Sequence, residues 1–195
     1  MKDLEKYQKK LQRYMDKSRY QHTLGVMYTA ASLAMAYQYD IDKAMFAGLL
    51  HDCAKNVPHE KKLELCKKYQ VEVTDIEREN PFLLHAKVGA IIARKKYHVK
   101  DEEILHAIAV HTTGAPNMNT LDMILFIADY IEPGRDKAKN LGQVRKMAYQ
   151  NLEHTVEKIL SDTLNYLNGK SGRIDPTTEL TYQYYKNRRE LANEH

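Results

Sequence analysis

Ionisable side chains directly follow or interrupt apolar helical segments at several separate places in the sequence. The adjacent pair His51-Asp52 comes straight after Ala47-Gly48-Leu49-Leu50. Burying either side chain without a partner would cost several kcal/mol, roughly 2–7 for a neutral polar group and more for a charge. A metal cation is a partner for both, and a carboxylate can bind two ions, one through each oxygen. The pair therefore indicates a metal site at the end of an apolar helix.

Four more residues share this placement in or beside an apolar helical face, namely His22, His85, His111 and Asp129. A lone case is more often a satisfied core residue, but six cases on different helices are hard to satisfy separately. One shared site explains all six. A mixed imidazole and carboxylate set suits Fe, Mn or Zn better than Ca or Mg, which favour all-oxygen shells. Two histidines and two carboxylates could hold one ion, and two further histidines a second beside the bridge.

The remaining five histidines read as background, because His59, His98, His154 and His195 lie among polar residues. His106 is the one rival ligand. It is five residues from His111 on the same expected helix, so the two do not share a face, and we prefer His111. Cys53 follows Asp52 directly, but a small buried apolar residue is its simpler interpretation.

The elements that must position these residues are helices, because apolar residues recur at helical spacing and no convincing strand pattern is present. We expect helices over about 3–15, 18–37, 44–54, 59–69, 81–92, 101–111, 121–131, 141–167 and from 176 onward. Ser18 and Thr120 are the expected N-caps of two of them. Residues 70–80 are expected to be mostly loop. The prediction is an all-α fold.

Length and composition favour one soluble domain spanning residues 1–195, with a core over about 18–135 and C-terminal helices over 140–192 packed on it. The net charge of +4, from 30 basic and 26 acidic residues, is too weak to indicate a nucleic-acid binder. No apolar run is long enough to span a bilayer, and the start does not resemble a signal peptide. Two cysteines imply no disulfide framework and favour the reducing cytoplasm.

Several ordered segments resemble the HD-domain phosphohydrolase superfamily and, more closely, its bacterial YqeK family. They are Arg19-Tyr-Gln-His22, Ala47-Gly-Leu-Leu-His-Asp-Cys-Ala-Lys55, Leu83-Leu-His-Ala, His111-Thr-Thr-Gly and Ile127-Ala-Asp-Tyr-Ile-Glu-Pro-Gly-Arg135. The superfamily signature, a histidine, a His-Asp doublet and a distant aspartate, falls on His22, His51-Asp52 and Asp129. The extra His85 and His111 resemble the dinuclear branch. The resemblance extends from about Tyr14 to Tyr185.

The resemblance implies an HD-domain helical bundle. It also implies the activity of a symmetrical dinucleoside tetraphosphatase, which converts diadenosine tetraphosphate into two ADP. It also implies a di-iron centre and a homodimer, with dinucleoside polyphosphate and ADP as small-molecule partners and neither nucleic acid nor membrane. Manganese and zinc are the alternatives to iron.

Our mechanistic hypothesis assigns His22, His51 and Asp129 to one ion, His85 and His111 to the other, and Asp52 to both. Two ions about 3.5–4 Å apart can hold a bridging hydroxide at neutral pH. The hydroxide is expected to attack an inner phosphorus, so that a nucleoside diphosphate leaves. Asp52, Lys55 and Asp129 are the expected catalytic residues.

Substrate contacts are expected from the ligands His22 and Asp129 and from cations near them. Lys55, Arg19 and Arg135 are placed to reach phosphate oxygens, although each has a solvated-cation alternative. Backbone N–H groups of Thr112 and Gly114 could approach phosphate, unless they only mark a helix stop.

The loop Gly172-Arg-Ile-Asp-Pro-Thr-Thr178 resembles the segment that closes over the nucleotide in this family, which implies contacts from Arg173, Ile174 and Thr178. Tyr182, Tyr184 and Tyr185 either stack on a base or pack on the core, and packing is the simpler interpretation. Two other functions remain open: a broader HD nucleotidase or phosphodiesterase, and a non-catalytic metal-bearing nucleotide sensor.

Overall fold

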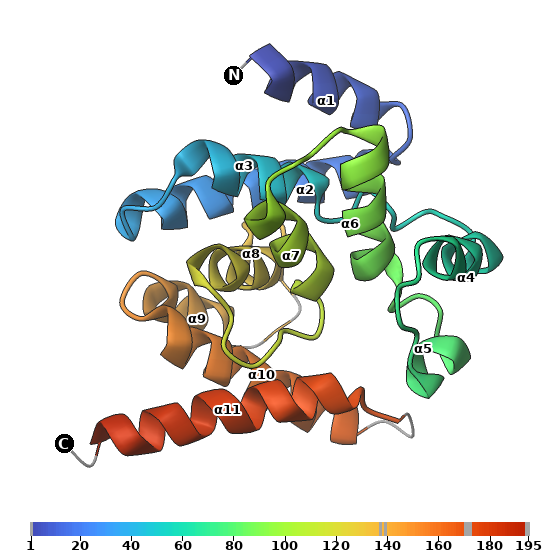
Figure 1. The fold of residues 1–195 in the computed structure, drawn as a ribbon. Helices are drawn as coiled ribbons and strands as arrows, with labels where there is room; N and C mark the ends of the chain where they lie inside the picture. Colours follow the sequence, from blue (N-terminus) through green and yellow to red (C-terminus); the bar gives the residue numbers. More distant parts are fainter. Residues whose placement is uncertain (1, 137, 139, 170–172, 194–195) are drawn as a thin grey trace.

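The computed structural model describes residues 2–136, 138, 140–169 and 173–193, and these residues form helices and no strand. The all-α fold expected from the sequence is confirmed (Figure 1). In chain order the helices are α1 (Lys2–Gln12), α2 (Lys17–Ala36), α3 (Ile41–Leu50), α4 (His59–Lys68), α5 (Asp75–Glu79), α6 (His85–Lys96), α7 (Glu102–Val110), α8 (Thr120–Ile131), α9 (Leu141–Ala148), α10 (Leu152–Asn168) and α11 (Pro176–Asn193).

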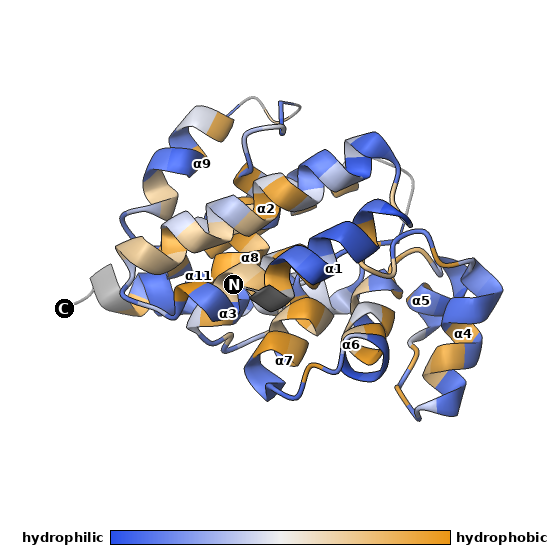
Figure 2. Cartoon of the chain, turned by 90° about the horizontal axis from the view of Figure 1, so that it is seen from above, coloured by the Kyte–Doolittle hydropathy of each residue, from blue (hydrophilic) through white to orange (hydrophobic). Residues whose placement is uncertain are grey.

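Helix α8 is the central element of the main hydrophobic core. Every residue from Leu121 to Ala128 is buried, and Figure 2 shows α8 as a hydrophobic helix inside the bundle. Helices α2, α3, α7 and α10 pack directly against it. A helix that is apolar all round must be enclosed by others, so Asp129 on this helix is held in a fixed position.

Helices α2 and α3 pack closely against each other. A Cβ atom added at Gly48 would lie 2.8 Å from the Cα atom of Met27, so only glycine permits this spacing. The two helices carry His22 and His51, and their close packing brings these side chains together.

A second, smaller hydrophobic cluster joins α4 and α6 beside the main core. It consists of Ala54, Cys66, Leu84 and Val88. In Figure 1 α4 and α5 lie to one side of the bundle, next to α6. The segment 70–80, expected to be mostly loop, contains α5, because Thr74 and Glu77 form a reciprocal capping box at its start.

Some expected helix boundaries were wrong for reasons of capping. Asp16, and not Ser18, caps α2 by accepting from the backbone N–H of Arg19, and Asn119 caps α8 in place of Thr120. The single helix expected over 141–167 is two helices. Asn151 adopts an extended backbone and accepts from the N–H of His154, which starts α10 anew after α9.

The C-terminal helices pack on the rest of the bundle. Helix α10 lies against α8 and α11, and the main core includes Tyr185 of α11 together with Leu11 near the other end of the chain. Figure 1 shows α11 crossing the molecule at the end opposite α1. In the part of the chain that is described, no helix combines the length and apolar character needed to cross a membrane.

Candidate metal centre

Three histidines of the centre lie at helix ends and are oriented in the same way. The Nδ1 atoms of His51, His85 and His111 each lie 2.7 Å from the carbonyl oxygen three residues earlier. A carbonyl oxygen only accepts, so each Nδ1 carries the proton and each Nε2 presents a lone pair. For His51 and His111 these carbonyls lie in the last turns of α3 and α7, where carbonyls lack a partner within the helix. For His85, which begins α6, the carbonyl belongs to the turn before that helix.

His51 and Asp52 lie in the turn that follows α3. The α-helix ends at Leu50, earlier than expected, and residues 51–57 continue with backbone bonds from Cys53 to Leu50, from Lys55 to Asp52 and from Val57 to Ala54. These bonds span three residues, so the turns wind more tightly than an α-helix. Both side chains are buried, and both face the same centre.

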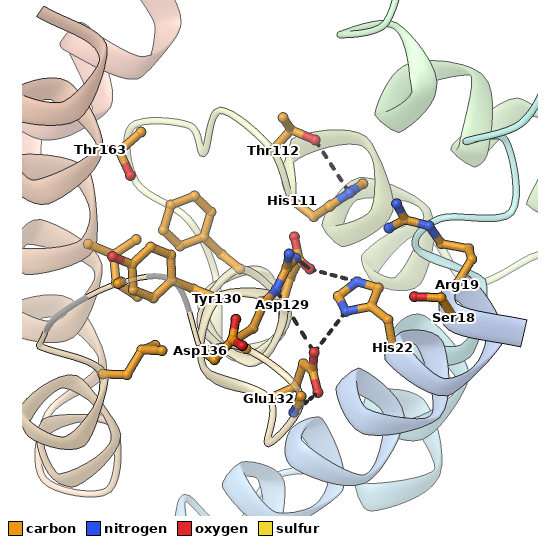
Figure 3. Close-up of a pocket in the computed structure, with 16 residues that line it drawn as sticks. Ser18, Arg19, His22, His111, Thr112, Asp129, Tyr130, Glu132, Asp136 and Thr163 are labelled. Carbon is orange, nitrogen blue, oxygen red and sulfur yellow. Dashed lines mark hydrogen bonds and ion pairs between the residues drawn. The ribbon is translucent and has the colours of Figure 1, made fainter. Parts of the chain in front are cut away.

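The fourth histidine, His22, is held by a carboxylate and not by a carbonyl. Its Nδ1 lies 3.1 Å from Oε1 of Glu132, and its Nε2 lies 3.0 Å from Oδ1 of Asp129 (Figure 3). Glu132 is 3% exposed, and its other oxygen accepts from the N–H of Gly134 at 2.6 Å. An added Cβ at Gly25 would lie 2.4 Å from this carboxylate, so the site makes room for it.

Asp52 lies between two pairs of histidines. Its Oδ2 is 3.6 Å from Nε2 of His51 and 3.9 Å from that of His22, whereas its Oδ1 is 3.3 Å from His85 and 3.7 Å from His111. Within each pair the two Nε2 atoms are 3.2–3.3 Å apart. One carboxylate oxygen therefore faces each pair.

The donor set fits a metal. Oδ1 of Asp52 is a buried carboxylate oxygen with no hydrogen-bond donor among the described residues. The facing Nε2 lone pairs of His85 and His111 would repel each other without a cation between them. Two sets of atoms lie close enough to share an ion: His22, His51 and Asp129 form one, and His51, Asp52 and His111 form the other.

The protonation states also suit metal ligands. Burial lowers the pKa of His51 to about 4 and also lowers that of His85, so both imidazoles are neutral near pH 7. Burial opposes ionisation of Asp52 and Asp129. Even so, neighbouring imidazoles and the cations Lys55 and Arg135 hold the pKa of each carboxyl below its usual range.

Three cations already touch the centre. Arg19 lies 2.7 Å from Oδ2 of Asp52, Arg135 lies 2.6 Å from Oδ1 of Asp129, and Nζ of Lys55 lies 3.0 Å from Nε2 of His85. Arg19 and Lys55 are partly exposed and Arg135 is 43% exposed. All three expected phosphate-binding cations therefore reach the candidate metal ligands, and their long side chains can turn toward an anion.

A cavity of about 540 Å³ opens beside the centre and runs toward α10. His22, His111 and Asp129 line its inner end, with Arg19 and Arg135 at its walls. Figure 3 shows Tyr130 and Thr163 at the side away from Arg19. The cavity thus combines metal ligands, cations and partly apolar walls.

The turn after α7 brings Thr112 to the centre and Gly114 against α11. Thr112 lies at the centre, with Oγ1 3.3 Å from Nε2 of both His85 and His111. The N–H of Gly114 instead donates to the carbonyl of Val110, which favours the helix-stop alternative. Gly114 has φ +68°, and an added Cβ would lie 2.8 Å from Thr181 on α11.

The late loop lies against α5 at the start of α11. Arg173 forms an ion pair with Glu79 at 3.0 Å, and Thr178 is buried. Gly172 lies outside the described residues. The packing alternative holds for the tyrosines, because the Tyr185 hydroxyl accepts from the N–H of Met118 and the Tyr184 hydroxyl donates to Asn117.

The rival residues have other roles. His106 is 53% exposed and pairs with Asp122 at 2.9 Å, away from the centre. Cys53 donates its thiol to the carbonyl of Gly89, and burial raises its pKa to about 12. Glu132 was missed as a functional residue, although it follows an apolar helix just as His51 does, and that placement was the available signal.

Comparison with known proteins matches residues 19–134 to the HD domain family. A symmetrical bis(5'-nucleosyl)-tetraphosphatase of Bacillus subtilis is 37% identical over 85% of this chain and 88% of its own length. One from Staphylococcus aureus is 34% identical over 88% of this chain and 98% of its own length.

A solved structure is also similar. It is the crystal structure of a Clostridium acetobutylicum protein described as a predicted HD superfamily hydrolase involved in NAD metabolism. The two chains are 40% identical, with a TM-score of 0.91 over 94% of this chain and 97% of the other.

Proposed function

The chain belongs to the HD domain family, within its group of symmetrical bis(5'-nucleosyl)-tetraphosphatases, and we propose that it is a metal-dependent hydrolase that cleaves diadenosine tetraphosphate into two ADP. The observation that carries this proposal is the position of Asp52. Its Oδ2 faces the pair His22 and His51, and its Oδ1 faces the pair His85 and His111. Among the residues described, Oδ1 has no hydrogen-bond donor. This geometry supports a metal-assisted reaction, and the named relatives support the substrate.

In the proposed ligand set, His22, His51 and Asp129 would hold one divalent ion, His85 and His111 would hold a second, and Asp52 would be a ligand of both. The four imidazoles and two carboxylates suit iron, with manganese and zinc as alternatives. Bound ions would activate water at neutral pH and offset charge on the phosphoryl oxygens.

The residues of this chain position the phosphates. Asp52 and Asp129, once paired with metal, no longer need Arg19 and Arg135, whose guanidinium groups are then available for phosphate oxygens. Lys55 lies between the centre and solvent and is the proposed contact for the departing diphosphate. Thr112 offers a hydroxyl at the same place.

One nucleoside diphosphate half is proposed to enter the large cavity, with its phosphates toward the metal centre. Arg173, Ile174 and Thr178 are proposed to close over this half. Their proximity to the centre is supported by Thr181, one turn after Thr178, which contacts Gly114 of the turn that carries Thr112.

The test is product analysis with iron-loaded protein purified without oxygen. Wild type should convert diadenosine tetraphosphate to ADP alone. His51→Ala and Asp52→Ala should each reduce the rate by more than about a hundredfold, because loss of a residue that only orients a metal ligand already costs about 10–100-fold. Equal residual hydrolysis in all three proteins would make the catalytic assignment wrong.

The same assay separates the two alternatives. Faster turnover of ATP, deoxynucleoside monophosphates or cyclic nucleotides would indicate a broader nucleotidase or phosphodiesterase. Tight nucleotide binding without turnover would indicate a sensor. The names of the relatives favour neither alternative.

The proposal includes a homodimer in the cytoplasm that acts without nucleic acid. Two large side chains on α2, Tyr28 and Met35, are both 60% exposed. They are seven residues apart and so lie on one face of the helix, which supports a surface that a second copy of the chain covers. Both cysteines are free thiols. Light scattering of the purified protein measures the mass, and a mass of one chain at micromolar concentration would argue against the dimer.

A further inference from the structure

A second pocket opens beside the metal centre, away from the large cavity. It has a volume of about 230 Å³ and lies between the end of α1, the turn over residues 52–58 and the C-terminal half of α6. Asp52 lines this pocket, whereas Arg19 lines the large cavity, and the two side chains are joined at 2.7 Å. The Arg19–Asp52 ion pair thus lies between the two hollows.

We propose that this second pocket binds the other nucleoside of the dinucleotide, an inference that rests on the proposed function. The substrate has two identical nucleosides joined by four phosphates. Central cleavage requires the middle of the phosphate chain to lie at the metal centre, so each nucleoside must extend to a different side. The large cavity accounts for one side, and the second pocket lies on the other.

The lining of the second pocket suits a base and its sugar. Met15 and Pro58 give apolar walls, and the ring of Tyr14 is 61% exposed at the rim. Asn56 is exposed, and its side chain forms no hydrogen bond with any described residue. An aromatic ring can stack on a base, and an amide can both donate to and accept from a base edge.

The charge around the second pocket suits the phosphate chain. The ammonium group of Lys96 lies 4.1 Å from the ring centre of Tyr14, and Lys10 reaches the carbonyl of Lys96 from α1. Lys55 follows Asp52 in the same turn and faces the metal centre. A phosphate chain that joined the centre to the pocket would therefore meet Lys55 at the centre and Lys96 at the pocket.

The test compares two substrates that differ by one nucleoside. Adenosine 5'-tetraphosphate has the same phosphate chain as diadenosine tetraphosphate but lacks the second nucleoside. Met15→Trp should fill the pocket, and Asn56→Ala should remove its amide without adding bulk. We expect Met15→Trp to raise the KM for the dinucleotide about tenfold, since stacking of one base is worth this factor or more.

The same variant should change the KM for adenosine 5'-tetraphosphate less than about twofold, on the same scale. Asn56→Ala should act in the same direction with a smaller effect. Gln12→Trp is the matched control, because it adds the same bulk to the same end of α1 at an exposed position outside the pocket. Equal changes for both substrates, or no change for either, would overturn the inference.

A binding measurement keeps this result separate from the proposed function. Calorimetry with a methylene-bridged, non-hydrolysable analogue of diadenosine tetraphosphate needs no turnover. If wild type binds it more tightly than adenosine 5'-tetraphosphate and Met15→Trp removes the difference, the pocket binds a nucleoside even in a protein without hydrolase activity. Equal affinity of wild type for both compounds would overturn the inference while leaving the hydrolase proposal intact.

Discussion

Glu132 is a positioning residue for His22. The carboxylate fixes the proton of His22 on Nδ1, which leaves the Nε2 lone pair free to bind a cation. Space is made for it by Gly25, and the N–H of Gly134 holds its second oxygen. We predict that Glu132→Gln, which keeps the shape but removes the charge, weakens iron binding about 10–100-fold, measured by competition with a chelator.

The role of Glu132 through His22 is tested by a double-mutant cycle. In a His22→Ala background, Glu132→Gln should change iron affinity little, because the ligand that it orients is gone. Glu179→Gln is the surface control, since this side chain is exposed and its carboxylate accepts a hydrogen bond from Gln183 on the same helix. An undiminished effect of Glu132→Gln without His22 would mean that the carboxylate acts elsewhere.

The choice between His111 and His106 can also be decided one residue at a time. His111 is 3% exposed with Nε2 in the centre, whereas His106 is half exposed and pairs with Asp122. His111→Ala should lower the bound metal per chain and reduce hydrolysis more than about a hundredfold, whereas His106→Ala should keep both within about twofold. Metal analysis and initial rates measure this, and equal losses would restore His106 as a ligand.

At the scale of elements, the contact between α2 and α3 sets the distance between His22 and His51. Gly48→Ala would place a Cβ 2.8 Å from the Cα of Met27, and relieving this contact requires the backbone of one helix to move. We expect a loss of about 1–3 kcal/mol in the free energy of unfolding, as for other overpacked sites, together with weaker metal binding. Urea unfolding measures the first effect.

Gly142 provides the matched control for Gly48. It lies within α9, and an added Cβ there would meet nothing within 4 Å. Gly142→Ala should therefore stabilise the protein by about 0.5–1 kcal/mol through helix propensity. If the two substitutions changed stability in the same direction, close packing at Gly48 would not be the cause.

Helix α7, which ends at His111, begins with a charged cap. Asp101 accepts from the backbone N–H groups of Glu103 and Ile104, and Lys43 lies 2.8 Å from its carboxylate. The hydrogen bond from Lys43 lowers the pKa of Asp101. A lowered pKa in the folded state stabilises the protein above the unfolded value near 3.8, and this contribution is lost as the pH falls below about 4.

Asp101→Ala should cost about 1 kcal/mol at pH 7, the usual value of an N-cap. The difference between wild type and variant should shrink as the pH falls below about 4 and toward the lowered pKa of the folded protein, because the unfolded chain then takes up a proton that the folded Asp101 resists. Chemical unfolding at several pH values measures this difference, and a difference independent of pH would argue against the ion pair.

The all-α fold and the six candidate ligands could be predicted from the sequence. Apolar periodicity and ionisable residues within apolar segments are both local signals. The break between α9 and α10 could not, since Asn151 caps a new helix only through its own backbone geometry. The placement of Gly114 against Thr181 depends on two segments far apart in the chain. The second pocket likewise depends on α1 lying beside α6, which no local pattern indicates.

For the molecule as a whole, the proposed ligands come from α2, α8 and the ends of α3, α6 and α7. Metal binding would therefore connect five elements that are distant in sequence. A ligand that binds only the folded state at a hundred times its Kd adds about 2.7 kcal/mol. For a chain of this length, that corresponds to a Tm increase of roughly 5–11 °C.

Calorimetry of iron-loaded and chelator-treated protein tests this prediction together with the proposed single domain. Wild type should unfold in one transition in both states, since the main core contains residues from α1 to α11, and only its Tm should fall when metal is removed. His106→Ala should keep the full shift, whereas His51→Ala should lose it because the buried Nε2 at the centre is gone. Two transitions, or a Tm that does not respond to metal in wild type, would show that the six ligands do not act as one centre joining the bundle.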